Sequence, residues 1–294
     1  MEKFKNKKFE DYVVSTKTFI VYTNLILDID KLYGVLPITD YVVVQKKRGR
    51  KKKIQEDNPN KDIQDGSIIK VQNGSNFRGV EGKKNSRGKY FRNSMTFVIY
   101  IDGKLLNSKV SRNGKFQITG CKKDSQAEKC IDYFWKYISK FKTLYSFSDG
   151  EHLKTVYDPV MYNIDFSFGF EVNRENLDKY INTNTEYYSI LETTFGYTGV
   201  NIKIPVTASS DNFKIKQIEY LDQEQNISYI SYDQFQSQYR ENRKKESNKY
   251  NTFLVFQSGK VIMSGKSALF MEDVYYKFIN IISDCYQEIN NKLD

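Results

Sequence analysis

The sequence has 294 residues, a hydrophobic content of 39% and a formal net charge of +10. This length allows one or two domains with a sizeable core. The N-terminal residues lack the apolar segment of a secretory signal, and no apolar run approaches the roughly 18 residues of a membrane span. We therefore expect an intracellular, soluble protein with no membrane partner. Its positive charge either keeps it soluble or favours an anionic partner such as nucleic acid.

Residues that could carry catalysis are scarce. The chain has one histidine, His152, and its three cysteines form no C-x-x-C pair, so neither a metal site nor a disulfide framework is predicted. Asp28, Asp30 and Asp165 could be posed as acid–base carboxylates, but a helix cap and solvated charges are the favoured interpretation. The glycine-rich stretches lack the pattern of a phosphate-binding loop. We expect no enzymatic activity, no cofactor and no small-molecule substrate.

The chain begins with a predicted strand and a short helix. Residues 15–27 are rich in β-branched and aromatic side chains, which favours a strand. A short helix is expected from Asp28 to Val35, with Asp28 as its N-cap. Another short strand is expected at Tyr41–Val44, and mostly polar sequence follows as far as Lys89.

Three antiparallel strands in series and a long helix are predicted next. The strands are expected at 95–101, 105–111 and 116–119. Turns at Asp102-Gly103 and Asn113-Gly114 join them. Apolar residues at spacings of three and four then predict a helix at about 125–141.

The same order of elements returns in the second half. A strand is predicted at 161–172, where aromatic and aliphatic residues alternate with others, and a short helix from Asn173 to Ile181 follows it. Further strands are expected at 195–206, 251–257 and 261–264. A closing helix is predicted at about 269–291.

Two short stretches of the sequence are nearly copies of one another. The first, 113–122, reads NGKFQITGCK, and the second, 258–267, reads SGKVIMSGKS. Their glycines are offset by the same 145 positions, from Gly114 to Gly259 and from Gly120 to Gly265. We infer a duplicated unit from the echoed order and turns. The equal offset is partly a coincidence, because the extra sequence falls at different places in the two halves.

The duplication divides the chain into two repeats. Residues 1–12 are expected to form a flexible N-terminus. The first repeat is predicted at 13–150, with an insertion at about 46–90. The second repeat is predicted at 151–294, with an insertion at about 207–250.

A basic block lies inside the first insertion, at 46–53, and reads KKRGRKKK. Its core, Arg48-Gly49-Arg50, resembles that of an AT-hook, which lies in the narrow minor groove of A·T-rich DNA. The prolines that normally flank such a core are missing. A targeting signal or a solvated loop is therefore the alternative interpretation.

The repeated stretches resemble the TATA-binding protein (TBP) family. In that family a strand ending in Phe is followed by Ser-Gly-Lys, an apolar strand, Thr-Gly-Ala-Lys and a long helix. Residues 252–266, TFLVFQSGKVIMSGK, follow this pattern closely, and residues 108–122 follow it more loosely. Thr23-Asn24-Leu25 and the helix after it are similar to the first strand and helix of the family. Tyr162-Asn163-Ile164 is similar to the start of its second half.

The resemblance implies an α+β fold of the TBP type, a saddle in which two pseudo-symmetric repeats share a curved antiparallel sheet with helices on the convex face. Duplex DNA would lie on the concave face through its minor groove, with aromatic wedges kinking the ends of the site. Divergent family members occur in large DNA viruses, and a composition rich in Asn, Lys, Tyr and Ile would suit an A·T-rich genome. For a viral protein, the location would be the nucleus, the viral factory or the virion.

The resemblance also assigns DNA contacts to individual residues. The positions that read bases or contact the groove are Thr18, Ile20, Gln117, Thr119, Asn163, Ile262 and Ser264. The wedge positions are Phe77, Tyr197 and Phe256, with Phe91 as a rival placement for Phe77. Arg48 and Arg50 of the basic block are further candidate DNA contacts.

Two positions depart from the pattern of the family. Ser111 stands at the first-half wedge position that matches Phe256, so the first-half kink is expected to be weaker or absent. Asp165 stands where the family has Val, and a carboxylate there would oppose DNA phosphates unless it is turned away.

Two functional hypotheses follow from the sequence. In the first, the protein is a non-enzymatic, DNA-bending factor of transcription initiation. Its partners would be A·T-rich double-stranded DNA, basal transcription factors and the RNA polymerase machinery. In the second, the same fold is a protein-interaction scaffold that binds DNA non-specifically through the basic loop. Binding of an A·T-rich duplex, with a salt titration and a bending assay, distinguishes them.

Overall fold

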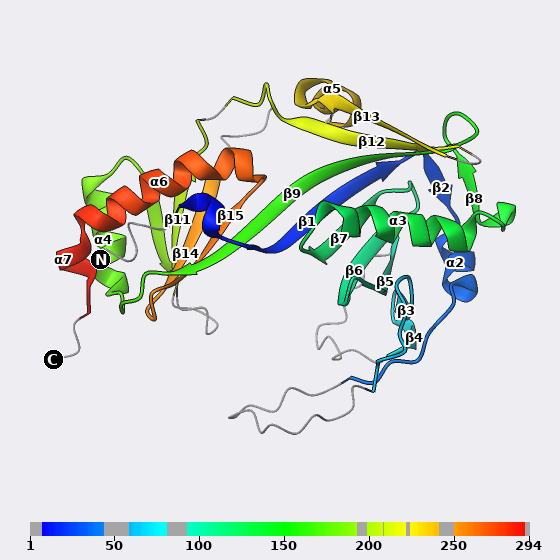
Figure 1. Ribbon diagram of the computed structural model, residues 1–294, viewed down its shortest axis with the longest axis horizontal. Coiled ribbons are helices and arrows are strands. Elements are labelled where there is room, and N and C mark those ends of the chain that lie inside the picture. Colours follow the sequence, from blue (N-terminus) through cyan, green and yellow to red (C-terminus); the bar gives the residue numbers. More distant parts are fainter. Residues whose placement is uncertain are drawn as a thin grey trace. The chain divides into compact units, whose positions relative to one another are not determined.

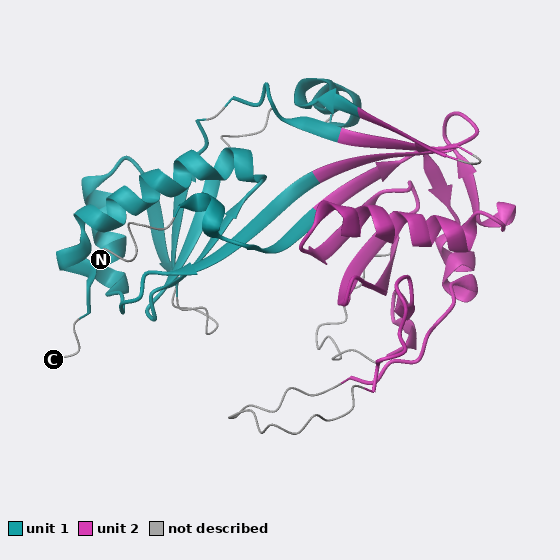
Figure 2. Ribbon diagram, viewed as in Figure 1, with its two compact units in different colours: residues 1–18, 159–215, 229–294 teal, residues 19–158, 216–228 magenta. Residues whose placement is uncertain are grey.

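The computed structural model describes residues 8–43, 59–80, 93–192, 199–207, 209–221, 224–240 and 250–291. They form an α+β fold of antiparallel strands and a few helices (Figure 1). The chain separates into two compact units (Figure 2). Unit 1 comprises Met1–Thr18, Pro159–Ile215 and Tyr229–Asp294, and unit 2 comprises Phe19–Asp158 and Lys216–Ser228. Unit 2 thus holds most of the first half of the chain, and unit 1 most of the second.

Unit 2 is an antiparallel sheet with a long helix packed against it. Its strand order is β9, β1, β7, β6, β5, β3, β4, and β12 pairs with β9. A small second sheet joins β2 and β8. The elements with residues in this unit are β1 (Val14–Thr23), β2 (Leu25–Leu27), α2 (Ile29–Val35), β3 (Ile68–Asn73), β4 (Asn76–Gly79), β5 (Ser94–Ile101), β6 (Lys104–Ser111), β7 (Phe116–Cys121), α3 (Asp124–Ile138), η2 (Lys142–Leu144), β8 (Tyr145–Phe147), β9 (Leu153–Ser167), β12 (Lys214–Tyr220) and β13 (Gln225–Ser231).

Several predictions for the first half are confirmed. Strands β5, β6 and β7 pair antiparallel in series through the two predicted turns. The helix α2 begins after Asp28, whose side chain accepts a hydrogen bond from the backbone N–H of Lys31 and so caps the helix. The predicted strand 15–27 is divided in two, because Asn24 stands between β1 and β2.

The core of unit 2 lies between its sheet and α3. Every second residue of β5 is buried there, and so are Phe116 and Ile118 of β7, since successive side chains of a strand point to opposite faces. The ring of Phe134 stacks on Phe97 with 5.4 Å between centroids and meets Phe116 edge-on at 5.0 Å. The helix is shorter than predicted, because it ends at Ile138 and a tight turn follows, in which Phe141 donates to the carbonyl of Ile138.

Unit 1 holds the remaining strands of the same large antiparallel sheet and has its own helices. The strand order is β10, β11, β14, β15, β9. The elements with residues in this unit, besides the parts of β1, β9, β12 and β13 that it shares, are η1 (Phe9–Asp11), α4 (Arg174–Asn184), β10 (Tyr188–Glu192), β11 (Gly199–Pro205), α5 (Tyr232–Arg240), β14 (Tyr250–Phe256), β15 (Lys260–Gly265), α6 (Ala268–Asp284) and α7 (Tyr286–Ile289). Its core lies between the sheet and α6, where Phe253 stacks on Phe278 with 3.9 Å between ring centroids.

The predicted closing helix and the predicted strand at 161–172 need correction. The closing helix is broken at Cys285, whose backbone (φ −90°, ψ 6°) leaves the helical range before α7 begins. Strand β9 starts at Leu153 and ends at Ser167. It starts early because residues 153–157 pair with β12, a partner more than 50 positions away that local pattern does not reveal.

The strand predicted at Tyr41–Val44 is wrong for its described residues, 41–43, which are irregular. Val42 and Val43 are 55% and 60% exposed. The side chain of Asn60 bonds both backbone groups of Val42, at 2.9 Å to its N–H and 2.8 Å to its carbonyl. An amide side chain thus takes the place that a neighbouring strand would occupy.

The polar insertion predicted at about 207–250 contains ordered elements. In unit 2, its strand β12 extends the sheet and contacts α3. Lys216 Nζ lies 2.8 Å from Glu128 Oε2, and the hydroxyl of Tyr220 donates to Asp132 at 2.5 Å. Burial raises the pKa of the Asp132 carboxyl above its ordinary value. Part of the predicted insertion therefore belongs to the packed structure of unit 2.

No helix in the described part of the chain is long and apolar enough to cross a membrane.

Candidate nucleic-acid interface

The sheet of unit 1 has one face under helix α6 and one face that no described helix covers. Helix α6 packs on β11, β14 and β15, and alternate residues of these strands are buried beneath it. The residues between them point the other way. We call their surface the open face of unit 1, and its members are Asn163, Asp165, Asn201, Lys203, Thr252, Leu254, Ile262 and Ser264.

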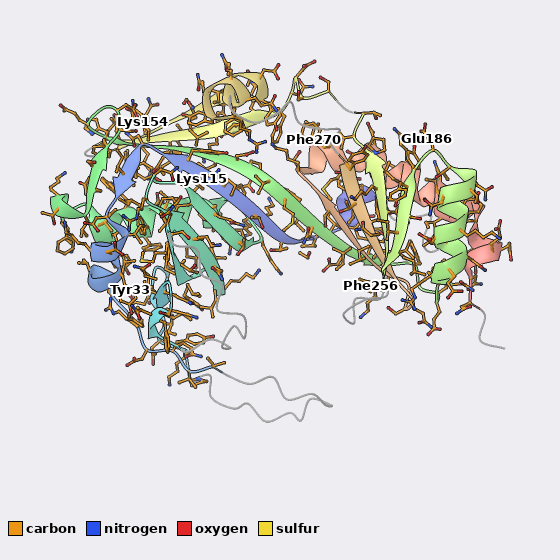
Figure 3. The ribbon with its side chains drawn as sticks, turned by 180° about the vertical axis from the view of Figure 1, so that it is seen from behind. Tyr33, Lys115, Lys154, Glu186, Phe256 and Phe270 are labelled. Atoms are coloured by element: carbon orange, nitrogen blue, oxygen red, sulfur yellow. The ribbon has the colours of Figure 1, made fainter. Side chains whose placement is uncertain are left out.

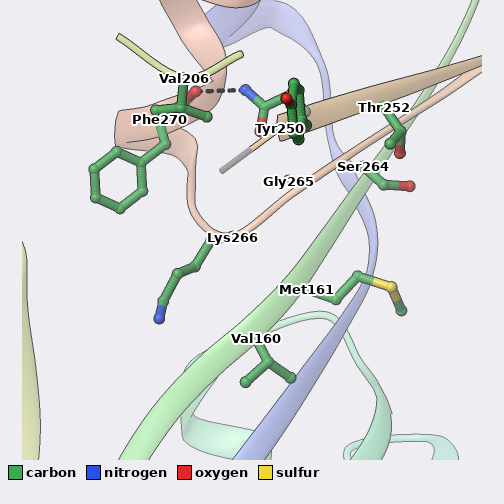
Figure 4. Close-up of a pocket in the computed structure, with 10 residues that line it drawn as sticks. Val160, Met161, Val206, Tyr250, Thr252, Ser264, Gly265, Lys266 and Phe270 are labelled. Atoms are coloured by element: carbon green, nitrogen blue, oxygen red, sulfur yellow. Dashed lines mark hydrogen bonds between the residues drawn. The ribbon is translucent and has the colours of Figure 1, made fainter. Parts of the chain in front are cut away.

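One row of polar side chains crosses this open face. Strand pairing sets Lys203 opposite Thr252, Thr252 opposite Ser264, and Ser264 opposite Asn163. Figure 4 shows the hydroxyl groups of Thr252 and Ser264 side by side. The amide oxygen of Asn163 is buried and has no hydrogen-bond partner among the described residues. The row therefore offers ammonium, hydroxyl and amide N–H groups as hydrogen-bond donors.

A second row, with aliphatic residues at its centre, runs beside the first. It joins Asn201, Leu254, Ile262 and Asp165 in register. The hydroxyl of Ser15, on β1, lies 3.2 Å from Asp165 Oδ1 and 3.1 Å from the backbone oxygen of Asn163. The carboxylate at the end of this row is thus held by a hydroxyl donor and stays exposed.

The sheet of unit 2 has an open face of the same construction, opposite α3. Two rows cross it, Lys70–Val98–Asn107–Thr119 and Gln72–Thr96–Lys109–Gln117. These rows contain two lysines and three amides, whereas the rows of unit 1 contain one lysine and two amides; each unit has two hydroxyl residues in its rows. Gln117 and Asn107 are exposed, and neither side chain has a hydrogen bond among the described residues. We call this surface the open face of unit 2. Phe77 and Ser111 also belong to it.

Two of the predicted wedge residues lie at the margins of these faces. Phe77, on the outer strand β4, is 44% exposed and pairs with Gln72. Phe256 is half-buried at the end of β14, opposite Gly199 (Figure 3). Ser111, which matches Phe256 in the other half, donates its hydroxyl to Asn113 Oδ1 at 2.8 Å within the turn.

The structure places the predicted contact residues unequally. Asn163, Ile262 and Ser264 are neighbours on the open face of unit 1, and Gln117 and Thr119 lie on β7 in unit 2. Ile20 is half-buried in β1, and Thr18 is only 5% exposed, so its contact with a base stays a prediction. The remaining predicted positions, Arg48, Arg50, Tyr197 and the rival Phe91, lie outside the described residues.

Several members of the open faces were missing from the predicted contacts. They are Lys70, Gln72, Thr96, Val98, Asn107 and Lys109 in unit 2 and Asn201, Lys203, Thr252 and Leu254 in unit 1. The members on β6 and β14 could have been predicted from the sequence. The alternation of side chains that predicts these strands also shows which of their residues share a face.

A pocket of about 390 Å³ opens beside Thr252 and Ser264 in unit 1 (Figure 4). Its other lining residues are Val160, Met161, Val206, Tyr250, Asn251, Gly265, Lys266 and Phe270. The amide nitrogen of Asn251 donates to the carbonyl of Phe270 at 2.5 Å, which ties the start of β14 to the start of α6. Lys266 Nζ is bonded to the hydroxyl of Tyr232 at 2.6 Å.

Groups for metal binding or nucleophilic chemistry do not gather at these faces. Within the described ranges, no three His, Cys, Asp or Glu side chains come together so as to hold a metal ion. The three cysteines are buried and form no disulfide, and burial raises the pKa of the Cys130 thiol to about 12. A thiol with such a pKa is protonated at neutral pH and is a poor nucleophile.

A viral protein and a solved structure are among the known proteins to which this chain is similar. No protein-family model matches the sequence. The chain is 24% identical over 224 residues to the uncharacterized protein 335L of Invertebrate iridescent virus 6, a match that covers 71% of this chain and 64% of the viral protein. The structure is similar to Methanococcus jannaschii TBP, with a TM-score of 0.41 and 13% identity over 92% of this chain and 98% of that chain. The functional conclusion therefore depends on the two open faces themselves.

Proposed function

We propose that the protein is a non-enzymatic DNA-binding factor that contacts the minor groove of A·T-rich duplex DNA through the open faces of its two units, and that it acts in transcription initiation as TBP-like proteins do. The proposal depends on one observation: each unit has a row of hydrogen-bond donors on a sheet face that no described helix covers. The row Lys203–Thr252–Ser264–Asn163 in unit 1 is the clearer of the two.

The chemistry of the rows suits the minor groove of A·T pairs. That groove displays the acceptors adenine N3 and thymine O2, so hydroxyl, amide N–H and ammonium groups are its natural partners. Aliphatic residues such as Leu254 and Ile262 would pack against sugars and base edges between these hydrogen bonds. The net charge of +10 adds a sequence-independent attraction to the phosphates.

Phe77, Phe256 and Tyr197 are proposed as wedges that unstack base steps and bend the duplex. Helices α3 and α6, which lie on the opposite faces of the two sheets, would then contact basal transcription factors and RNA polymerase. The resemblance of residues 252–266 and 108–122 to the TBP repeat supports both assignments.

One observation favours the second candidate function, a protein-interaction scaffold. Asp165 places a carboxylate on the open face of unit 1, where DNA would bring phosphates. A scaffold of this fold would bind a protein on that face and would contact DNA non-specifically, if at all, through the basic block at 46–53.

The test is equilibrium binding of a fluorescent A·T-rich duplex over a range of salt concentrations, with a G·C-rich duplex of equal length as competitor. The proposal expects preference for the A·T-rich duplex and a salt slope that reflects several phosphate contacts. Ser264→Ala should weaken binding about fivefold, the loss of one hydrogen bond. The matched control, Ser237→Ala on α5, bonds only within its own helix and should bind like the unaltered protein.

Bending is measured separately, by energy transfer between dyes at the two ends of the duplex. Phe256→Ala, Phe77→Ala and Tyr197→Ala should each lower the transfer. Unchanged transfer in all three variants would remove the wedge assignment. Equal binding of A·T-rich and G·C-rich duplexes with no effect of Ser264→Ala would favour the scaffold.

A further inference from the structure

Asp165 is the one acidic residue in the rows that cross the two open faces. It pairs with Ile262 on β15, and the odd-numbered residues of this part of β9, Asn163, Asp165 and Ser167, all lie on the face away from α6. The carboxylate is therefore not turned into the core. The hydrogen bond from Ser15 explains how the carboxylate is held. It does not explain what an acidic side chain would contact on a surface that is proposed to bind DNA.

The surroundings of Asp165 leave its charge on the surface. Among the described residues it forms no ion pair, and its one hydrogen bond comes from the Ser15 hydroxyl at 3.2 Å. Lys17, on the same strand as Ser15, has its ammonium 4.3 Å from the ring centroid of Tyr162. An ionised carboxylate only accepts hydrogen bonds, so most of its acceptor positions still need donors.

The minor groove contains a single kind of donor. Adenine N3 and thymine O2 are both acceptors, and only the N2 amino group of guanine donates. Against an A·T pair, the Asp165 carboxylate would lose water and gain no partner, which is costly for a charged group. Against a G·C pair it would accept a charge-assisted hydrogen bond, one of the stronger kinds.

We propose that Asp165 accepts a hydrogen bond from the N2 amino group of guanine, so that the target of this protein is an A·T-rich duplex with one G·C pair beneath unit 1. This inference rests on the proposed minor-groove function and specifies its substrate. Ser15 is a positioning residue, because its hydroxyl orients the carboxylate and is not itself proposed to contact a base.

Unit 2 does not repeat this requirement. In the proposed duplication, the position that matches Asp165 is Ile20, an apolar and half-buried residue. Gln117, on the adjoining strand β7, carries an amide that both donates and accepts, so it suits an A·T or a G·C pair. One G·C preference is therefore expected for the whole site, and it belongs to unit 1.

The experiment measures binding to a set of duplexes in which one G·C pair is moved stepwise through an A·T-rich site. One position should bind about tenfold more tightly than the all-A·T duplex, as a good base contact provides. Replacing that guanine by inosine removes only the N2 amino group and should abolish the gain. Asp165→Val should bind the all-A·T duplex more tightly than the unaltered protein and should show no preferred G·C position.

Four further variants separate base readout from general effects of charge and test the positioning of Asp165. Asp165→Asn keeps the shape and should retain a smaller preference. Asp273→Asn removes the same charge from an exposed position of α6 and should leave the preference intact. Ser15→Ala should reduce the preference with little change in binding to the all-A·T duplex, and Ser15→Thr should restore it.

The outcomes distinguish this inference from the proposed function. If no duplex binds, the proposed function fails. If the A·T-rich duplex binds but every G·C pair weakens binding equally in the unaltered protein and in Asp165→Val, minor-groove binding stands and the role of Asp165 is refuted. A gain that survives inosine would also refute it, because the contact would then not be to the amino group.

Discussion

The hairpins β6–β7 and β14–β15 share one register and differ in their chemistry. Lys109 pairs with Gln117 in unit 2, and Leu254 pairs with Ile262 at the positions 145 residues later. Asn107 and Thr119 likewise correspond to Thr252 and Ser264. Because the register depends on the turns and on the buried residues, the open faces can differ without changing it. The hairpin of unit 2 presents a lysine and amides there, and the hairpin of unit 1 presents mainly aliphatic and hydroxyl side chains.

The buried faces of the same hairpins also differ, and neighbouring aromatic residues compensate for the difference. Phe253 in unit 1 stacks on Phe278 of α6, whereas the matching residue in unit 2 is Ser108, whose hydroxyl lies 3.1 Å from the thiol of Cys130. Unit 2 obtains its aromatic packing from Phe116 and Phe97, which contact Phe134 of α3. A well-filled core is thus reached with the large side chains on different strands.

The largest expected effect concerns the matched buried residues Phe253 and Ser108. Phe253→Ala should lower the free energy of unfolding by about 3–5 kcal/mol, because it empties a stacked aromatic site. Ser108→Ala should change it by no more than about 1 kcal/mol, since one weak contact to a thiol is lost. Urea denaturation measures both. Equal losses would show that the two buried faces are packed alike after all.

The next effect concerns what the two hairpins share. Gly114 and Gly259 have positive φ angles of 68° and 72°, and an added Cβ would overlap backbone oxygens of Leu25 and Phe170 respectively. Each Gly→Ala change should cost about 2 kcal/mol or more, from the strained backbone and the overlap together. Gly103, with φ of 76° and open space at its Cβ, is the control and should lose only about 1 kcal/mol.

A smaller effect separates the helix caps of the two units. Asp28 caps α2 in unit 2, and Asn173 caps α4 in unit 1 by accepting from the N–H of Asn176 at 3.0 Å. Asn173→Ala should cost about 1 kcal/mol at any pH. The hydrogen bond from the backbone of Lys31 holds the pKa of Asp28 below its ordinary value.

The sign of the pH effect follows from that lowered pKa. Asp28 stabilises the folded state above the pKa of the unfolded chain, about 3.9, and this contribution is lost as the pH falls through the lower pKa of the folded state. The thermal midpoint of the unaltered protein should therefore approach that of Asp28→Asn as the pH falls below about 4. A constant difference between the two proteins down to pH 2 would contradict this. Asn173→Asp should introduce the same pH dependence in unit 1.

The smallest effect exchanges the chemistry of the open faces. Lys109→Leu should reduce the slope of log K against log salt by about 0.9, the value for one phosphate contact on duplex DNA. Leu254→Lys should raise it by a similar amount in unit 1. Fluorescence titrations at several salt concentrations measure the slopes. If the slope does not respond to either change, the lysine of unit 2 contacts base edges or no DNA at all.

The hairpins and their two faces could be predicted because local chemistry specifies them. Turn residues at 102–103 and 113–114 and alternating side chains predict β5, β6 and β7, and the same alternation assigns Gln117 and Thr119 to one face. Asp28 and Asn173 mark helix starts through hydrogen bonds to residues three positions away. Such signals need no distant partner.

The predictions that were wrong concern segments whose contacts are distant in the sequence. Tyr41–Val43 has strand-like residues and is irregular, because the side chain of Asn60 and not a strand bonds Val42. The region 207–250 is polar, yet β12 pairs with β9 and contacts α3 through Lys216 and Tyr220. Strand formation requires a partner, and a partner distant in sequence leaves no periodic signal.

The sequence by itself determined the two similar hairpins, their glycine turns and the helix that follows each. It determined which residues of β6, β7, β14 and β15 share a face, because the side-chain period of a strand is two. The tertiary structure alone decided which face stays open and which distant strands extend each sheet. It also placed Asp165 beside Ser15, 150 positions away, on the open face of unit 1. Such contacts depend on long-range packing, which no window of neighbouring residues contains.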